Sequence, residues 1–397
     1  MISRDIEMLQ YKCILTPLTP IQIGNGNDIS PFEYVIKNGE YYRIDINEVM
    51  EKVPENIKKQ FLKVLEENSM FTARKFLKNN YRKEYGYIYK CPVSPDYVDI
   101  YERKIAGVSN KNENNELAVS EFIGTNTEKY IPGSTLKGAF RSAYLFENFT
   151  SDNFYEIKRE EFNRNGKKNP TKPFKSLGNK DILLKKIESQ ILELENFNAQ
   201  FDPFKNLKIT DTETRNNVIE VKQILRKGMK KEGKKEIPMG NFEVTKSLFS
   251  SNENIEFGFQ IIIKNLTGNK NELLKRLSIK QDKKTREYIQ QIRETVEFYL
   301  EDGGILEFLN NKADKIIKED IKFFEKIKDK KSLEFCYELQ NYKEKLNENQ
   351  AMIRIGRGAG FNSTTFNLCN KKIEEVFTRV TVDDIPIGWA LITCNEI

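Results

Sequence analysis

Tyr-Ile-Pro-Gly-Ser-Thr-Leu-Lys-Gly-Ala-Phe-Arg-Ser-Ala-Tyr, residues 130–144, reads as a loop that leads into a helix. Its apolar residues recur at the spacing that places them along one side of a helix: Leu136, Ala139, Phe140, Ala143 and Tyr144. Pro132 and Gly133 interrupt the backbone before them, and Ser134 or Thr135 can accept a hydrogen bond from a first-turn amide. The stretch therefore predicts a capped helix start.

This helix start has the parts of an anion site. Unpaired amides and the positive end of the helix dipole attract phosphate, and Lys137 and Arg141 add two cations on one face. The alternative is an ordinary capped helix that binds nothing. Gly133 and Gly138 lack the Lys-Ser/Thr pair of a Walker A loop, so an ATPase loses its main support.

Composition indicates a globular protein with a highly charged surface. The 397 residues are 38% hydrophobic and 31% charged, which favours two to three folded domains. A formal charge of +6 is too small to establish a polyanionic partner by itself. No secretory signal and no run of about 18 apolar residues is found, so we expect a soluble cytoplasmic protein without a membrane segment.

The chain contains no histidine. This excludes Ser-His and Cys-His nucleophile pairs, histidine-based ribonuclease chemistry and imidazole-ligated zinc. The cysteines are too dispersed to form a metal-ligand pair and are expected to be reduced thiols: Cys13, Cys91, Cys336, Cys369 and Cys394. We expect no cofactor and no bound metal.

The first half of the chain mixes strand and helix patterns. Gly24 to Asp28 is predicted as a tight turn, and residues 47–83 have a helical pattern. Strands are predicted from alternation at residues 11–15, 32–36, 41–44, 87–89, 97–101 and 207–212.

The second half begins with strands and contains a long helical region at residues 270–347. Of two basic segments, 156–176 is predicted as a flexible loop and 222–235 as a hairpin or loop tip, and either nucleic-acid contact or a solvated surface would explain them. Further strands are predicted at residues 218–221, 242–244, 255–263, 352–355, 379–382 and 388–392.

A second glycine cluster follows the strand that ends at Ile355. Gly356, Gly358 and Gly360 allow a sharp turn or a close approach to a ligand, and Arg354 and Arg357 can pair with phosphate. The spacing differs from the dinucleotide fingerprint, so a Rossmann fold is disfavoured. A purely structural turn is the alternative interpretation.

Two separated motifs together resemble the RAMP superfamily of CRISPR-associated proteins. They are Ile131 to Ala139, with its Ile-Pro-Gly-Ser-Thr-Leu-Lys-Gly core, and the distal glycine loop. Thr19 to Gly26 is similar to the first strand and turn of that superfamily, which adds Gly24, Asn25 and Gly26 to the candidate site. The helical region and Pro386 to Trp389 favour the branch found in type III-A (Csm) effector complexes.

The resemblance implies an α+β fold with two ferredoxin-like (RRM-related) domains. They would span residues 1–215 and 216–397, with a helical insertion at about 270–347 in the second. It implies a guide CRISPR RNA (crRNA) ligand, bound by Gly24, Asn25, Gly26, Gly133, Ser134, Thr135, Lys137, Arg141, Arg354, Gly356, Arg357, Gly358 and Gly360.

It also implies a cytoplasmic ribonucleoprotein used in antiviral defence. This subunit would cap the 3′-proximal end of the guide without cutting RNA, and would be needed for guide maturation. Its partners would be the repeated backbone subunit and the small helical subunit, with target RNA and a host nuclease as further candidates.

Two other functions stay open. A metal-dependent ribonuclease could use Asp28 or Asp211, although Gly24 to Asn27 before Asp28 departs from the pattern of the cleaving subunit. A pure protein scaffold would use the long helical region to contact its neighbours.

Overall fold

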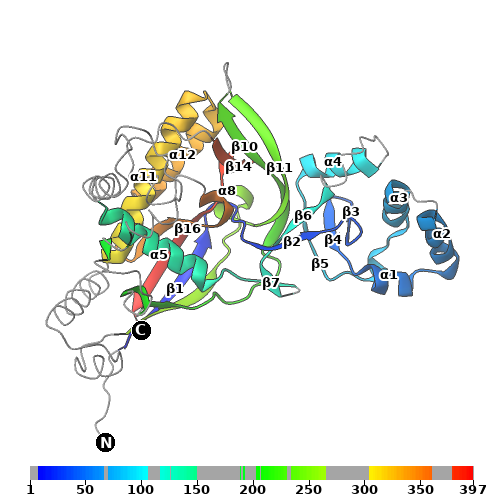
Figure 1. Cartoon of the computed structure of the whole chain (residues 1–397), viewed down its shortest axis with the longest axis horizontal. Coiled ribbons are helices and arrows are strands. Elements are labelled where there is room, and N and C mark those ends of the chain that lie inside the picture. Colours follow the sequence, from blue (N-terminus) through cyan, green and yellow to red (C-terminus); the bar gives the residue numbers. More distant parts are fainter. Residues whose placement is uncertain are drawn as a thin grey trace, which may run out of the picture.

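The computed structural model describes residues 8–66, 70–105, 117–125, 127–149, 188, 191–192, 203–205, 207–229, 234–264, 304–359 and 378–396. The fold is α+β, as predicted, with two large sheets and a smaller third sheet (Figure 1). Of the expected helical insertion, residues 304–347 are described. The predicted basic loop at 156–176 and Gly360 lie outside the described residues.

The first sheet is antiparallel and places the first described strand at its centre. Its five strands run in the order β13 (Gln350–Arg354), β16 (Trp389–Glu396), β1 (Met8–Pro17), β12 (Phe257–Lys264) and β9 (Leu207–Ile209). Along β1, Cys13 and Leu15 face the core, whereas Lys12 and Ile14 face outward. This alternation confirms the predicted strand at residues 11–15.

Two helices cover the inner face of this sheet. In α5 (Gly133–Glu147) and α11 (Gly304–Lys326), residues such as Leu136, Phe140 and Phe308 pack into one core with Leu15 and Phe259. The apolar stripe predicted for residues 130–144 is therefore confirmed. Helix α12 (Lys330–Lys343) packs against α11 and, with α8 (Leu248–Ser251), covers a second cluster around Trp389.

The second sheet is built around a long hairpin. Its six strands run in the order β15 (Ile385–Pro386), β14 (Thr378–Val382), β10 (Ile219–Met229), β11 (Lys234–Thr245), β6 (Val119–Phe122) and β2 (Gly24–Ile29). The prediction of a hairpin or loop tip at 222–235 is confirmed as a hairpin, because β10 pairs antiparallel with β11 as far as Met229 and Lys234. Lys222 and Lys227 lie within β10, buried and paired with carboxylates.

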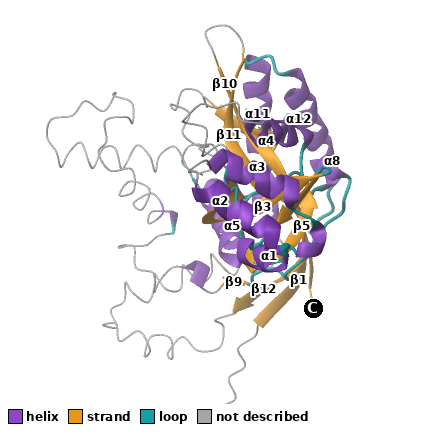
Figure 2. Ribbon diagram, turned by 90° about the vertical axis from the view of Figure 1, so that its right-hand side faces the viewer, coloured by secondary structure: helices purple, strands orange, loops and turns teal. Residues whose placement is uncertain are grey.

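A lobe of residues 30–105 projects from the two large sheets, which together with α5, α11 and α12 we call the body (Figure 1). Figure 2 shows the helices of the lobe in front of the body. The lobe contains a sheet of β3 (Tyr34–Lys37), β4 (Glu40–Arg43) and β5 (Tyr89–Pro92), with helices α1 (Ile46–Lys52), α2 (Glu55–Glu66), α3 (Met70–Asn80) and α4 (Pro95–Ile105). A two-stranded ribbon, β7 (Gly124–Thr125) with β8 (Glu128–Lys129), lies between β6 and α5 in the chain.

The predicted strands at 32–36 and 41–44 are confirmed as the antiparallel pair β3–β4, and the helices within 47–83 are also confirmed, but the strand at 97–101 was wrong. Tyr97, Tyr101 and Ile105 are buried at a spacing of four residues, which is the period of a helix, and Pro95 occupies the first helical position. The tight turn at Gly24 to Asp28 was also wrong as stated. This segment is strand β2, with a register break between Gly24 and Asp28.

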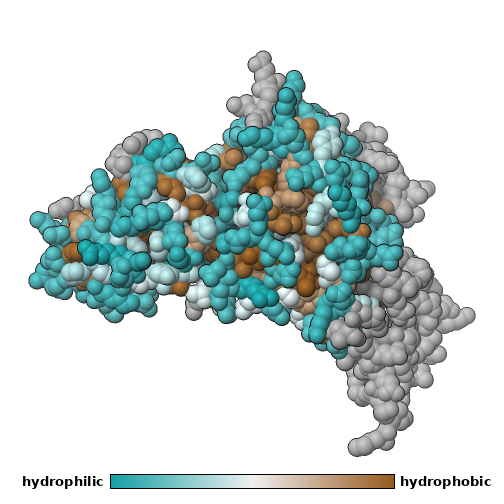
Figure 3. Space-filling view, turned by 180° about the vertical axis from the view of Figure 1, so that it is seen from behind, coloured by the Kyte–Doolittle hydropathy of each residue, from teal (hydrophilic) through white to brown (hydrophobic). Residues whose placement is uncertain are grey.

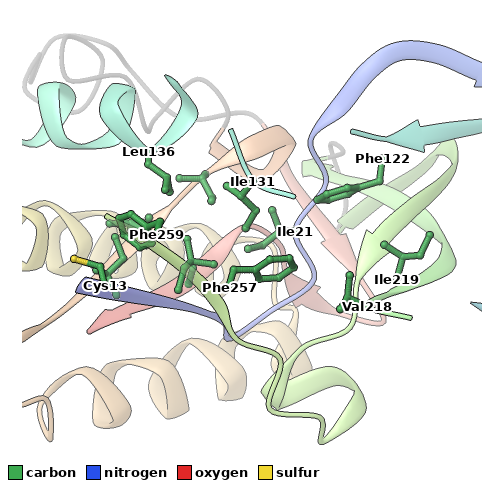
Figure 4. Packing of buried hydrophobic residues seen from close by; sticks show 14 of the residues in the cluster. Cys13, Ile21, Phe122, Ile131, Leu136, Val218, Ile219, Phe257 and Phe259 are labelled. Carbon is green, nitrogen blue, oxygen red and sulfur yellow. The ribbon is translucent and has the colours of Figure 1, made fainter. Parts of the chain in front are cut away.

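The main core continues from the body into the lobe. Ile21 lies beside Phe257 and Ile131 in this core (Figure 4). Seen from behind, hydrophilic residues cover most of the lobe, and hydrophobic residues gather in the middle of the body (Figure 3).

Both large sheets combine strands from either side of residue 215, because β1 and β9 join β12, and β2 and β6 join β11. The division at 215 and the ferredoxin-like domains stay predictions.

Candidate nucleic-acid interface

The segment Thr19 to Gly26 and the distal glycine loop meet in space. The Arg357 amide donates to the Gln22 carbonyl at 2.9 Å, and the Gly388 amide donates to the Pro20 carbonyl at 2.9 Å. The Arg357 and Gln22 side chains, 335 residues apart in the chain, also touch. Two of the three sequence motifs in the candidate site therefore form one surface.

Close backbone packing explains two glycines of the distal loop. Gly356 has a φ of +69°, and a Cβ there would lie 2.3 Å from the Gln22 carbonyl oxygen. A Cβ on Gly358 would lie 1.9 Å from the carbonyl oxygen of Ile387. These glycines shape the loop by letting it pack against the chain's own backbone. The loop itself is a 3₁₀ turn at Gly356–Ala359.

Arg357 is the exposed cation of this surface. Its guanidinium lies over the Phe242 ring at 4.5 Å from the centroid, and its Nε donates to Gln22 Oε1 at 3.2 Å. Within the described ranges, no partner is found for its two terminal nitrogens. Stacking and one hydrogen bond fix the plane of the guanidinium while leaving its outer edge able to bind an anion.

The register break in β2 between Gly24 and Asp28, which we call the β2 bulge, lies beside Gln22 and is exposed. Asn25 Nδ2 donates to Glu121 Oε2 at 2.7 Å, and Asn25 Oδ1 accepts from the Asn27 amide at 2.9 Å. Gly26 has a φ of +92° with open space around it, so a glycine is favoured here by backbone conformation alone. A Cβ on Gly24 would lie 3.2 Å from Gln22 Nε2, so Gly24 borders the same glutamine.

The start of helix α5 differs from the prediction. The Gly133 amide donates to Asp211 Oδ1 at 2.7 Å, and the N-cap residue is Pro132, with no side-chain cap. Capping by Ser134 or Thr135 was therefore wrong. The positive end of the helix attracts an anion, as argued from the sequence, but the anion in this structure is the carboxylate of Asp211.

The cations of α5 are partly engaged within the chain. Arg141 pairs with Glu188 at 3.3 Å and lies over the Phe204 ring at 5.3 Å from the centroid. Lys137 is half-buried on the same helix, and Ser134 is exposed. A phosphate at this helix start would compete with Asp211, so the site stays a prediction.

Arg354 points into the interior. Its side chain is 3% exposed and pairs with Asp320 of α11 at 2.8 Å, and Arg379 of β14 binds the other carboxylate oxygen. Burial lowers the pKa of Arg354, and Asp320 opposes that shift. The Arg354 guanidinium therefore connects the glycine loop to α11, and we leave it out of the proposed surface. Asp320 lies among the apolar positions of α11, which is the sequence signal that could have revealed this pair.

A second buried network lies beneath the β2 bulge, and the sequence did not reveal it. Lys129 pairs with fully buried Glu243 at 3.3 Å and with Glu121, the partner of Asn25, at 3.9 Å. Glu243 accepts from the Phe122 amide at 2.9 Å and from the hydroxyl of Tyr89 in the lobe. Burial raises the pKa of Glu243, although Lys129 opposes this. These contacts connect the bulge to the lobe.

Carboxylates also gather around Lys227. Glu236, Asp329 and Asp384 lie close enough to share a cation, but the ammonium group of Lys227 already lies among them, 2.5 Å from Asp329. Elsewhere, Asp28 accepts from the Ser120 hydroxyl at 2.7 Å, and Asp211 binds the Gly133 amide. Among the described residues, neither Asp28 nor Asp211 belongs to a group of three metal ligands.

The RAMP superfamily profile matches residues 14–363. The chain belongs to this superfamily. A curated relative, the CRISPR system Cms protein Csm5 of Methanocaldococcus jannaschii, is 29% identical over 269 residues, which are 65% of this chain. The chain spans 55% of the length of that relative.

Two solved structures have a similar fold. One is a chain of a cryo-EM structure of a Csm-crRNA-target RNA ternary complex of a type III-A CRISPR-Cas system, with a TM-score of 0.61 and 18% identity, covering 97% of this chain and 100% of that chain. The other is the crystal structure of T. onnurineus Csm5, with a TM-score of 0.59 and 16% identity, covering 95% and 99%. None of the described helices is long and apolar enough to cross a membrane.

Proposed function

We propose that this chain is a guide-RNA-binding subunit of a type III-A CRISPR effector complex. It would cap the 3′-proximal end of the guide and support guide maturation and antiviral defence. The relative named Csm5 and the similar chain in a Csm-crRNA-target RNA complex support this proposal. Its neighbours would be the repeated backbone subunit and the small helical subunit, with target RNA and a host nuclease as further partners.

The observation that carries the proposal is the position of Arg357. The guanidinium lies over the Phe242 ring where the β1–β2 connection meets the glycine loop, and its outer edge has no partner among the described residues. A planar guanidinium in this position suits a phosphate oxygen pair, and the exposed bulge at Gly24, Asn25 and Gly26 lies alongside. Such contacts hold an RNA backbone without reading its sequence.

We infer a non-catalytic role because both candidate acids have structural tasks. Asp28 accepts a hydrogen bond from Ser120 across the β2–β6 pair, and Asp211 binds the first amide of α5. Purified protein should therefore leave labelled RNA intact in magnesium or manganese. Divalent-dependent cleavage that Asp28→Ala abolishes would establish the ribonuclease instead.

The central test is Arg357→Ala with fluorescently labelled single-stranded RNA, measured by anisotropy across a salt series. We expect affinity to fall about tenfold for every sequence, the loss expected for one charge-assisted contact. The dependence of log affinity on log salt should become shallower by about 0.7 if one phosphate contact is lost. Arg103→Ala is the matched control, since Arg103 is exposed on α4 and its Nε bonds only within its own helix.

The same assay distinguishes the two candidate RNA contacts, which are the glycine-loop surface at Arg357 and the start of α5. Lys137→Ala with Arg141→Ala tests the start of α5, where Asp211 already binds the Gly133 amide. Equal affinity of Arg357→Ala and wild type at low salt would remove the glycine-loop surface from the interface. Ultraviolet crosslinks in the assembled particle that avoid both residues 130–144 and 354–361 would favour the protein scaffold.

A further inference from the structure

Cys13 and Cys394 lie directly opposite each other on neighbouring strands. Strand β1 pairs antiparallel with β16, and the register places Cys13 across from Cys394. Both side chains face the main core, where they are 2% and 8% exposed, and both are free thiols. Figure 4 shows the Cys13 sulfur within this core layer. Of the other described cysteines, Cys91 lies opposite Tyr41 and Cys336 lies in helix α12.

The hydrogen bonds of β16 show which type of pair this is. The Cys394 amide donates to Asn349, on the β13 side of the strand, at 2.9 Å. In an antiparallel sheet, the amide and carbonyl of one residue point to the same neighbouring strand, so Cys394 makes no ladder bond to β1. The two cysteines are therefore a non-hydrogen-bonded pair, whose Cα atoms typically lie about 4.5 Å apart with close side chains.

That geometry suits a disulfide without movement of the strands. Disulfides span Cα separations of roughly 4.4 to 6.8 Å, and the spacing of a non-hydrogen-bonded pair falls within this range. Both side chains project to the same face, because residues opposite each other in a ladder share a face. The neighbouring Cys394 thiol and burial together raise the pKa of Cys13, which agrees with the close pairing of the two side chains.

We propose that Cys13 and Cys394 are an oxidation site, which a small-molecule disulfide of the glutathione class converts to a cross-strand disulfide between β1 and β16. One thiolate attacks oxidised glutathione, which forms a mixed disulfide and releases one reduced glutathione. The second thiolate then attacks the protein sulfur and releases another. Two thiol protons leave, the protein loses two electrons, and oxidised glutathione gains them.

The bond would join the two strands that lead to the candidate interface. Strand β1 continues into the segment that contains Gln22, and β16 follows Gly388, whose amide binds Pro20. Because the thiols are buried, we expect slow oxidation in the folded protein and faster oxidation when mild denaturant opens the sheet. The inference does not depend on RNA binding.

The test is a peptide map of the whole chain after incubation with oxidised glutathione at about pH 8, with and without mild denaturant, followed by alkylation. We expect a linked pair of peptides that contain Cys13 and Cys394, two hydrogens lighter than the separate peptides. The oxidised protein should melt on the order of 5 °C higher, because the bond closes a very long loop, and dithiothreitol should reverse the shift.

Single variants give the matched comparison. Cys394→Ser should abolish both the linked peptide and the melting shift, whereas Cys336→Ser should keep both. The wild-type peptide map stands even if Cys394→Ser fails to fold. Free alkylated Cys13 and Cys394 in both incubations, stable glutathione adducts without a link, or a link to any other cysteine would each overturn the proposal.

Discussion

Two glycines of the predicted motifs have opposite surroundings. A Cβ on Gly358 would lie 1.9 Å from the Ile387 carbonyl oxygen. Gly138 is exposed within α5, and a Cβ there would have no heavy atom within 4 Å among the described residues outside its own helix backbone. The two sequence motifs contain these residues without distinguishing their roles. Only the contacts show that one glycine is required by packing and that the other is open to substitution.

Gly358→Ala should lower the free energy of unfolding by about 2–4 kcal/mol, because the new methyl group forces the loop away from Ile387. Gly138→Ala should raise it by roughly 0.5–1 kcal/mol, since alanine is the better helix former. Urea denaturation of both variants checks this. Similar values for the two would show that the glycine loop relaxes without cost.

At the scale of elements, ion pairs attach α12 to the β14–β15 hairpin. The hairpin turns through Asp383 and Asp384, both with positive φ, which is typical of a two-residue type I′ turn. Asp384 and Asp329, the N-cap residue of α12, both bind fully buried Lys227 on β10. Burial pushes the pKa of Asp384 up, but the hydrogen bond and charge of Lys227 outweigh this and hold it below its ordinary value of 3.8.

This depressed pKa gives a signed prediction. The stabilisation by ionised Asp384 is fully present above pH 3.8, its ordinary value, and is lost as the pH falls through the lower folded-state pKa. Asp384→Asn should therefore lower the free energy of unfolding by about 1–3 kcal/mol at neutral pH, and the deficit should shrink in acid. Asparagine tolerates the positive φ, so the turn is kept.

Asp383→Asn is the control for this variant. Its side chain is 50% exposed beside Lys222, so we expect a loss of under about 1 kcal/mol. Thermal melts of both variants from neutral to acid pH provide the measurement. An Asp384→Asn curve that runs parallel to the wild-type curve throughout would contradict the assignment.

At the scale of the whole molecule, the lobe and the body share one core and one buried polar network. Tyr34 and Tyr97 of the lobe belong to the same cluster as Leu15 and Phe257 of the body. Tyr89 of the lobe donates to Glu243 of β11, and Val93 bridges to Val221 of β10. We therefore expect the lobe and the body to unfold together.

Tyr89→Phe removes the hydroxyl that binds Glu243 and should cost about 1.5–3 kcal/mol, the range for a hydrogen bond to a charged group. Tyr87→Phe is the control, because Tyr87 is 44% exposed and should change stability by less than about 0.5 kcal/mol. Trp389, the single tryptophan, is buried in the body and reports unfolding by fluorescence. A lobe transition that leaves Trp389 fluorescence unchanged would show separate unfolding.

Local patterns predicted much of the fold. The alternation of residues 11–15 and the apolar stripe of residues 130–144 gave correct elements, because each pattern matches the period of its structure. The error at residues 97–101 also came from a local pattern, because a short tyrosine-rich run is typical of a strand. Only the burial of every fourth residue in the structure shows that this segment is a helix. Strands β1 and β16 could not be placed side by side from either pattern, because register depends on contacts distant in the chain.

The sequence by itself determined the helix within residues 130–144 and the superfamily motifs, since these depend on neighbouring residues, and the α+β class followed from the resemblance that those motifs carry. Only the tertiary structure decided which charges are available. Arg354 and Arg357 are three residues apart and look alike in sequence, yet Arg354 is buried against Asp320 and Arg357 stands exposed on Phe242. The anion at the start of α5 is likewise Asp211, brought there from 78 residues further along the chain. Residues distant in sequence determine whether a cation is paired and buried. Pairing and burial in turn decide whether that cation can bind a phosphate.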